Sequence, residues 1–303
     1  MNKETIITLT QTAFVCLLGV AFAFIGSNGY VFKEGLHPFA VAALWSFLVQ
    51  WVLFIPSFIA KSEKYFDLTG SFTFASATLI SIVLSQDLNE RSLILASMVI
   101  IWSSRLGYFL FNRIRKAGED GRFEKLKQSP TRFFAAWTLQ GLWVVFTTAP
   151  AFAAITSSQS KPIGTIAFVG IAVWLVGITI EIVADTQKSR FKADPANKGK
   201  FISNGLWALS RHPNYFGEIL LWIGVSVVSL QNLVGLQWIT LLSPILIAIL
   251  LIKVSGIPLL EKRADEKWGG EKDYENYKKR TPYLVPWRLS SRSKADMRRH
   301  STT

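Results

Sequence analysis

Two acidic side chains, Glu181 and Asp185, stand four residues apart near the end of an apolar stretch. On a helix this spacing places them on one face. Carboxylates accept hydrogen bonds from hydroxyl or amide groups of a ligand. The basic side chains that follow can form salt bridges or pair with phosphates; they are Lys188, Arg190, Lys192, Lys198 and Lys200. The pattern is typical of a dinucleotide site, although a loop whose charges neutralise one another has the same composition.

A second polar segment, residues 205–218 (GLWALSRHPNYFGE), leads into another apolar stretch. Pro213 suits the first turn of a helix, because that turn makes no use of the missing N–H. The N-terminus of such a helix attracts a phosphate or a carboxamide. The residues placed to contact a ligand there are Arg211, His212, Asn214, Tyr215 and Glu218. Alternatively, the Arg-His-Pro turn anchors the chain at a membrane surface and Asn214 caps the helix, which leaves Glu218 unexplained inside an apolar run.

The composition indicates that membrane-spanning helices carry these residues. Half of the 303 residues are apolar and 17% are charged, the mean hydropathy is +0.32, and soluble domains carry about 25% charged residues. Eight apolar runs are long enough, or nearly so, to cross about 30 Å of hydrocarbon as helices. We place them at 6–26, 36–60, 68–85, 92–112, 133–155, 163–184, 213–230 and 234–253. The expected fold class is all-α, a polytopic membrane bundle of about eight transmembrane helices.

The distribution of basic residues predicts the orientation of this bundle. With the N-terminus in the cytosol, 28 of the 33 Lys and Arg residues fall in the cytosolic segments, whereas the opposite loops hold only Lys33, Arg91 and Lys161. Cytosolic loops of membrane proteins carry such an excess. We therefore expect both termini in the cytosol and a multi-pass protein of a bacterial inner membrane or the endoplasmic reticulum. Its net charge of +13 then belongs to membrane-facing loops, and no nucleic acid partner is expected.

Cysteine and histidine are too few for a disulfide framework or a metal centre. The chain has one Cys and three widely spaced His, so no metal ligand set is expected. Segment 261–287 mixes Trp and Tyr with charges and predicts a helix docked on the membrane face. Residues 289–303 predict a basic, disordered tail.

The few charges within or beside the spans all fall on one side. Arg105, Glu181 and Glu218 lie within spans, and Asp67 and Asp185 lie at span ends. Each intramembrane charge costs about 2.5–3.5 kcal/mol on insertion, so each needs a reason. Under the expected topology all five lie in the cytosolic half, which predicts one polar cavity open to the cytosol.

Several motifs spread along the chain are shared with a known family. They are 65–71 (YFDLTGS), 102–106 (WSSRL) with Arg113 and Ile114, 118–123 (GEDGRF), 137–143 (WTLQGLW), 210–218 (SRHPNYFGE), 255–261 (SGIPLLE) and a Trp-Gly…Tyr…Tyr…Pro tail. On these motifs, the chain from about Tyr65 to Trp287 resembles the DUF1295 membrane proteins of the steroid 5α-reductase superfamily (3-oxo-5α-steroid 4-dehydrogenase-like).

The resemblance implies an NADPH-dependent reductase of a carbon–carbon double bond in a steroid or other lipid. Such an oxidoreductase acts on the CH–CH group of an enone that enters from the bilayer. The nicotinamide C4 supplies the hydride, and a polar side chain polarises the substrate carbonyl. It implies one domain over 1–288, with substrate-side helices in 1–132 and cofactor-side helices and loops in 133–288. The implied cofactor contacts are Arg105, Glu181, Asp185, Lys192, Lys200, Asn214, Glu218 and Tyr277.

The chain departs from the steroid reductases at four of these functional positions. Those enzymes typically have Asn where this chain has Glu181, and Arg where it has Lys192 and Lys200. They also polarise the substrate ketone with a Tyr at the position of Trp102. The remaining candidates for the proton donor are Asp67, Tyr65 and Tyr108, so a strict 3-oxosteroid activity is not expected.

Two other functions share parts of the pattern. Membrane methyltransferases of the isoprenylcysteine carboxyl methyltransferase type also have an Arg-His-Pro-x-Tyr turn and a similar tail, and they bind S-adenosylmethionine. The placement of Asn214 and Glu218 around that turn, and the lysines of 185–212, favour the reductase. A non-enzymatic lipid-binding or transport protein is the third alternative, but such transporters often contain inverted repeats, and we find none. No oligomeric state is predicted.

Overall fold

The computed structural model describes residues 3–32, 35–117, 121, 123–254 and 256–286. Within these ranges the chain forms helices and no strand, which confirms the all-α prediction. Most of the motif at 118–123, as well as Ser255, Trp287 and the tail 289–303, lie outside the described residues.

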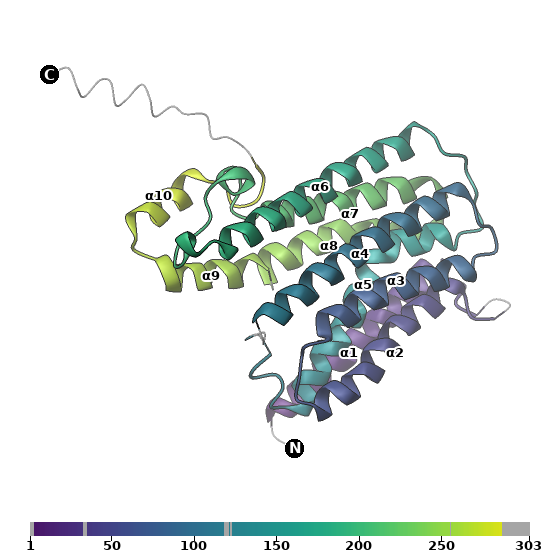
Figure 1. The fold of residues 1–303 in the computed structure, drawn as a ribbon. Coiled ribbons are helices and arrows are strands. Elements are labelled where there is room, and N and C mark those ends of the chain that lie inside the picture. The colour runs from purple at the N-terminus through teal and green to yellow at the C-terminus, as the bar shows by residue number, and fades with distance from the viewer. Residues whose placement is uncertain (1–2, 33–34, 118–120, 122, 255, 287–303) are drawn as a thin grey trace. The chain divides into compact units, whose positions relative to one another are not determined.

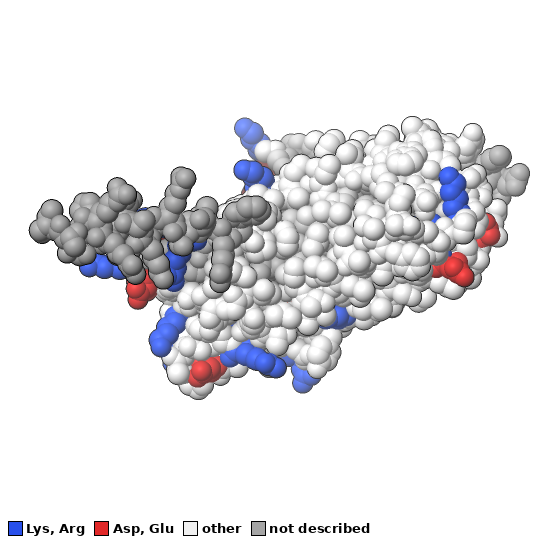
Figure 2. Space-filling model, turned by 90° about the horizontal axis from the view of Figure 1, so that it is seen from above, with Lys and Arg blue, Asp and Glu red and all other residues white. Residues whose placement is uncertain are grey.

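Eight helical segments are long and apolar enough to cross a membrane. They are α1 (Lys3–Gly26), α2 (Pro38–Ile59), α3 (Phe66–Val83), α4 (Glu90–Ala117), α5 (Pro130–Ile155), α6 (Thr165–Ala193), α7 (Pro213–Ser229) with its extension to Asn232, and a last segment, Gly235–Trp268. Figure 2 shows that much of the helical surface on the face drawn there carries neither basic nor acidic side chains. These features fit a multi-pass membrane protein; its orientation and the type of membrane stay predictions.

Helices α4 and α6 are longer than the apolar runs within them. The runs were expected to end at residues 112 and 184, but α4 continues to Ala117 and α6 to Ala193. Backbone hydrogen bonds depend little on whether side chains are apolar, so a helix can continue into a charged segment. The last segment is composite, with η4 (Gly235–Leu242), α8 (Ser243–Ile249), the π-helical η5 (Leu250–Val254) and α9 (Ile257–Trp268). Helix α10 (Lys272–Arg280) follows, so the expected helix in 261–287 is divided between α9 and α10.

The chain forms two compact units, Met1–Ala172 with Trp222–Leu246, and Val173–Leu221 with Ile247–Thr303. In the first unit, α3 packs on α4 and α2, and α1 and α2 pack on α5 (Figure 1). Helix α5 is the central one, since 78% of its apolar window is buried. The expected division between substrate-side and cofactor-side helices concerns function and stays a prediction.

Small and polar side chains hold the first unit together. Gly141 on α5 lies against the backbone of Ser46 on α2, and Gln50 on α2 donates a hydrogen bond to Thr73 on α3 at 2.7 Å. Helices in membranes associate through such close packing and interhelical hydrogen bonds, because lipid provides no hydrophobic drive between them.

Arg91 was expected in an outside loop, and that expectation is wrong. The residue belongs to the first turn of α4 and is only 1% exposed. Its guanidinium donates hydrogen bonds to the carbonyl oxygens of Val228 at 2.7 Å and Pro162 at 3.0 Å, and to Gln231 Oε1 at 2.8 Å. A fixed fork of donors can satisfy several acceptors at once, so Arg91 ties the start of α4 to the segments before α6 and after α7.

The second unit contains the later part of α6, the start of α7, the end of α8, α9 and α10. Two short 3-10 turns, η1 (Pro195–Asn197) and η2 (Gly205–Ala208), connect α6 to α7. Ala184, Ile202 and Trp207 form one hydrophobic cluster of this unit. An aromatic cluster made by Phe201 with three rings of α9 and α10 adds to this packing.

Candidate functional site

Ten of the eleven predicted cofactor contacts belong to the second unit. These are Glu181, Asp185, Lys192, Lys200, Arg211, His212, Asn214, Tyr215, Glu218 and Tyr277. The eleventh, Arg105, belongs to the first unit. The geometry of the second unit therefore decides which of these side chains share one site.

A glycine contact brings the start of α7 against α6 at Glu181. A Cβ atom added at Gly217 would lie 2.7 Å from the backbone nitrogen of Glu181 and from the carbonyl oxygen of Gly177. At Gly177 an added Cβ would lie 2.5 Å from the nitrogen of Leu221. The two backbones can approach this closely only because both positions lack a side chain. Glu181 thus lies beside the turn of α7 that carries Glu218.

The two acids of α6 are buried. Glu181 is 3% and Asp185 6% exposed, and both take part in polar interactions within the structure. Beside them, Trp207 Nε1 donates to the carbonyl oxygen of Ala184 at 3.0 Å. Tyr277 Oη in turn donates to the carbonyl oxygen of Trp207 at 2.7 Å. This series of bonds joins α10, η2 and the acidic face of α6.

Tyr277 has a structural role in addition to the predicted one. Burial raises the pKa of its phenol above the usual range, so the hydroxyl stays protonated and keeps donating to Trp207. A phenol oxygen can accept a hydrogen bond while it donates one. The predicted contact with a cofactor is therefore compatible with this bond.

The basic residues that follow α6 differ in their surroundings. The Lys188 ammonium lies over the Trp207 ring, 4.3 Å from its centroid. Lys192 and Lys200 are exposed. Exposed lysines suit the flexible recognition of phosphates as point charges, which is the role that the sequence predicts for them.

Arg211 and His212 both contact Glu261 of α9. His212 Nε2 lies 2.8 Å from Glu261 Oε1, and Arg211 forms an ion pair with Glu261 Oε2. The Tyr215 ring stacks on the His212 ring at a centroid distance of 5.9 Å. Burial lowers the pKa of His212, with Lys188 and Arg211 adding to this and Glu261 opposing it, so the imidazole is neutral near pH 7.

A later segment of the chain closes over this turn. Ser210 Oγ donates to the carbonyl oxygen of Leu284 at 2.6 Å, and the N–H of Arg211 donates to that of Pro282 at 2.9 Å. The Arg211 guanidinium also lies 5.2 Å from the centroid of the Tyr283 ring. Residues 282–284 thus hold the residues just before α7 in place.

Unpaired polar atoms gather where α7 begins. Arg211 Nε, His212 Nδ1 and Asn214 Oδ1 are buried and have no hydrogen-bond partner among the described residues. The described part of the second unit has one further side-chain atom of this kind, Trp174 Nε1. A buried polar atom without a partner costs about 1–3 kcal/mol, so three of them in four residues point to a polar ligand.

Glu261 and Gly217 belong to the candidate site, and the sequence motifs did not predict a role for either. Both lie within motifs quoted for the family resemblance, but neither received a role. Glu261 follows a short apolar run, and its charge there was a signal that could have been used. The sequence gives no indication that its partner is His212, 49 residues earlier.

In the first unit, Arg105 and Trp102 lie on α4. The Arg105 guanidinium lies 5.4 Å from the centroid of the Phe109 ring. Trp102 is 1% exposed and packs edge-on against Phe74 at 5.1 Å and Trp222 at 4.9 Å. The position at which the steroid reductases have a ketone-binding Tyr is therefore part of an aromatic cluster in this chain.

The three proton-donor candidates lie on α4 or at the start of α3. Asp67 pairs with Arg113 at 3.4 Å. The Tyr65 ring is half exposed and stacks on Phe111 at 6.4 Å. Tyr108 is 75% exposed. All three side chains therefore stay candidates for the proton donor.

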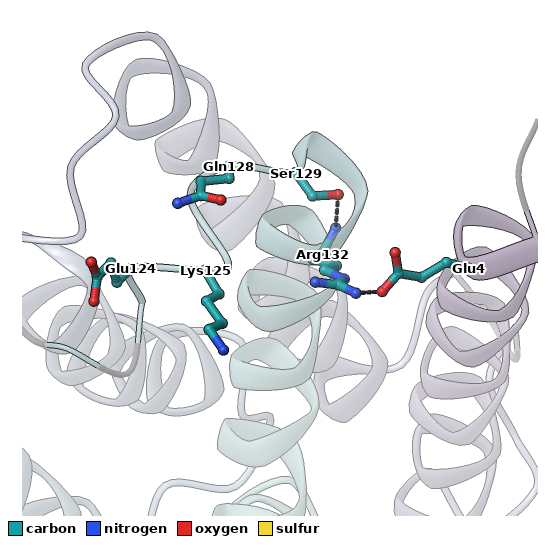
Figure 3. A pocket seen from close by; sticks show the side chains of 6 residues that line it. All are labelled: Glu4, Glu124, Lys125, Gln128, Ser129 and Arg132. Carbon is teal, nitrogen blue, oxygen red and sulfur yellow. Dashed lines mark hydrogen bonds and ion pairs between the residues drawn. The ribbon is translucent and has the colours of Figure 1, made fainter.

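A polar hollow of about 450 Å³ in the first unit does not contain any of these residues. It is lined by Glu4, Glu124, Lys125, Gln128, Ser129 and Arg132 (Figure 3). Arg132 pairs with Glu4, and Ser129 Oγ accepts a hydrogen bond from the N–H of Arg132 at the start of α5. A lining of charged and polar groups with balanced charge does not suit the apolar body of a lipid substrate.

The comparison with known protein families agrees with the motifs. Residues 53–281 match the family described as "Protein of unknown function (DUF1295)". The chain belongs to the DUF1295 family. All ten predicted contacts of the second unit lie inside the matched region of this DUF1295 chain.

Two proteins similar to this DUF1295 chain carry different descriptions. The "Uncharacterized protein C594.04c" of Schizosaccharomyces pombe is 24% identical over 249 residues, which cover 69% of the chain and 72% of that protein. The "Probable O-methyltransferase ustE" of Ustilaginoidea virens is 34% identical over 117 residues, 34% of the chain and 41% of that protein. No solved structure matches the DUF1295 chain.

Proposed function

We propose that this DUF1295 protein is an NADPH-dependent reductase of a carbon–carbon double bond in a steroid or other lipid. The single observation that carries the proposal is the glycine contact of Gly217 with α6, which sets Glu181 beside the turn of α7 with Asn214 and Glu218. These are the positions at which the steroid 5α-reductase superfamily contacts its cofactor, according to the resemblance of the motifs.

The donors and acceptors of the second unit fit a dinucleotide. Glu181 and Asp185 are buried acids that can accept hydrogen bonds from ribose hydroxyls, and Lys192 and Lys200 are exposed cations that can pair with phosphates. The unpaired His212 Nδ1 and Asn214 Oδ1 supply further acceptors. This division of acids and cations matches a ligand that has both hydroxyl and phosphate groups.

In the proposed reaction the chain binds and orients the cofactor and donates a proton to the substrate. When bound, NADPH supplies a hydride at the nicotinamide C4. The residues of the second unit would bind and orient the cofactor. Asp67, Tyr65 and Tyr108 stay the candidates for the proton donor. Trp102, in its aromatic cluster, cannot accept the role of the ketone-binding Tyr, because an indole N–H is a donor with no proton to give at neutral pH.

Ligand-dependent melting of the purified full-length protein tests this proposal. NADPH that binds the folded state raises the melting temperature. We expect a shift with NADPH, no shift with S-adenosylmethionine, and loss of the NADPH shift in Glu218→Gln and in Asn214→Ala. An NADPH shift that is unchanged in both variants, or absent in the wild type, contradicts the proposal.

One comparison favours a second candidate, an S-adenosylmethionine-dependent O-methyltransferase. The relative from U. virens, whose printed name is "Probable O-methyltransferase ustE", shares 34% identity over 117 residues. Arg211 also forms an ion pair with Glu261, which partly neutralises one cation that a phosphate would need. A melting shift with S-adenosylmethionine, and none with NADPH, would select this candidate; a shift with neither would favour the non-enzymatic lipid-binding protein.

A further inference from the structure

The Glu261 carboxylate contacts both residues that precede α7, Arg211 and His212. The contact with Arg211 fixes the charge of the carboxylate, and this charge determines which hydrogen-bond role His212 must have. One carboxylate oxygen pairs with Arg211, and the other lies 2.8 Å from His212 Nε2. An arginine stays protonated in proteins, and its charge favours an ionised carboxylate. An ionised carboxylate can only accept hydrogen bonds, so Nε2 of His212 must carry a proton.

The other imidazole nitrogen then has a defined role. In a neutral histidine only one ring nitrogen carries a hydrogen, and the other is an acceptor. Nδ1 of His212 is therefore an acceptor. It is buried and has no partner among the residues that the structure describes, while the ring is held by Tyr215 on one face and by the edge contact with Tyr283 at 5.7 Å.

We propose that Glu261 is a positioning residue, which fixes His212 so that Nδ1 accepts a hydrogen bond from a neutral N–H or O–H group of the cofactor. The inference rests on the proposed function and specifies the chemistry of that site. His212 recognises an amide or hydroxyl group and not a phosphate, because a lone pair repels an anionic oxygen. Arg211 keeps the carboxylate of Glu261 ionised, and its unpaired Nε–H remains a donor for an acceptor group of the ligand.

Two parts of NADPH can provide the donor, the nicotinamide carboxamide and a ribose hydroxyl. They are distinguished with 2′-phospho-ADP-ribose, which lacks the nicotinamide but keeps ribose hydroxyls. If His212 receives the carboxamide, His212→Ala weakens the binding of NADPH and leaves that of 2′-phospho-ADP-ribose unchanged. If it receives a ribose hydroxyl, the binding of both ligands weakens.

The first experiment measures the histidine tautomer and needs no ligand. Full-length protein with ¹⁵N-labelled histidine is studied by NMR at neutral pH, and the signal of His212 is assigned by its loss in His212→Gln. We expect Nε2–H with an unprotonated Nδ1 in the wild type, and a loss of this single state in Glu261→Met, which removes the acceptor. Glu266→Met removes the same charge from an exposed position of α9 and serves as the control. A hydrogen on Nδ1 in the wild type, or no change in Glu261→Met, overturns the positioning role.

The second experiment measures the coupling of the two residues in cofactor binding. We expect His212→Ala and Glu261→Met each to weaken NADPH binding about three- to tenfold, the equivalent of one hydrogen bond. The double variant should bind no more weakly than either single one, because the residues act as a unit. Fully additive losses, or wild-type binding in Glu261→Met, overturn the proposal.

The outcomes separate this inference from the proposed function. If neither NADPH nor S-adenosylmethionine binds the wild type, the proposed function fails and so does the ligand contact of His212. The tautomer experiment still decides whether Glu261 fixes the ring. If NADPH binds the wild type and Glu261→Met equally well, the proposed function stands and the inference fails.

Discussion

Replacement of Gly217 by alanine is expected to push α7 away from Glu181 and to weaken cofactor binding. The added Cβ would lie 2.7 Å from two backbone atoms, Glu181 N and Gly177 O, and ordinary contact begins at 3.4 Å. Backbone atoms cannot rotate aside, so the two helices must separate by about 0.7 Å. Overpacking of this kind costs about 1–3 kcal/mol, and the higher helix propensity of alanine offsets about 0.8–1 kcal/mol of that.

The effect on binding should exceed the effect on stability. A hydrogen bond to a charged group contributes about 1.5–3 kcal/mol, so the loss of one bond between Glu181 and the cofactor weakens binding about ten- to hundredfold. Thermal unfolding of the purified protein with and without NADPH measures both quantities in one series.

Gly170→Ala is the matched control. Its Cβ would lie 2.8 Å from Val228 N and 2.9 Å from Gly224 O, so it disturbs the same pair of helices within the first unit. We expect a similar loss of stability in this variant and an unchanged affinity for NADPH. Wild-type affinity in Gly217→Ala, or equal losses of affinity in the two variants, would refute the reasoning.

Three further predictions concern stability. Arg91→Met should lower the free energy of unfolding by at least about 3 kcal/mol, because the two shortest hydrogen bonds of the Arg91 guanidinium contribute about 1.5–3 kcal/mol each. Lys161→Met, at an exposed position, is the control in thermal unfolding. A loss of stability in Arg91→Met no larger than in this control would contradict the prediction. Burial lowers the pKa of His212, so at a pH below the ordinary histidine pKa of about 6.5 the unfolded chain binds the proton more readily than the folded one, and stability falls as the pH falls. The melting temperature of His212→Gln should fall less steeply with pH over this range than that of the wild type. Equal slopes would argue against a buried neutral ring. Tyr277→Phe should lower the stability by about 0.5–1.5 kcal/mol, because it removes the hydrogen bond to Trp207. The loss should exceed that of Tyr283→Phe, because the Tyr283 hydroxyl makes a longer hydrogen bond of 3.5 Å. The reverse order in thermal unfolding would count against the bond between Tyr277 and Trp207.

The apolar runs predicted the eight spans because burial in lipid requires about twenty apolar residues in sequence. They did not predict where α4 and α6 end, since a helix continues through charged residues once its backbone hydrogen bonds are in place. Arg91 was misplaced for a related reason. A charged residue next to an apolar run reads as a loop residue, and only the carbonyl groups of Val228 and Pro162, far along the chain, show that it can be buried.

The candidate site was predictable where its residues are local in sequence. The spacing of Glu181 and Asp185, and the turn that leads into α7, predicted two parts of the candidate site, and the contact of Gly217 with Glu181 brings these two parts together. Glu261 was not predictable in this way, because its role depends on contacts with Arg211 and His212 that tertiary packing creates. Gly217 has no functional group, so its importance is visible only from the distance between two backbones.

The contacts of residues 282–284 with Ser210 and Arg211 have a consequence for biosynthesis. The ribosome makes α6 and the turn before α7 long before it makes Glu261, Tyr277 and Leu284. The candidate site is therefore still incomplete when the earlier helices have been made. On the proposed function, a nascent chain that stops before residue 261 is expected to lack a complete cofactor site.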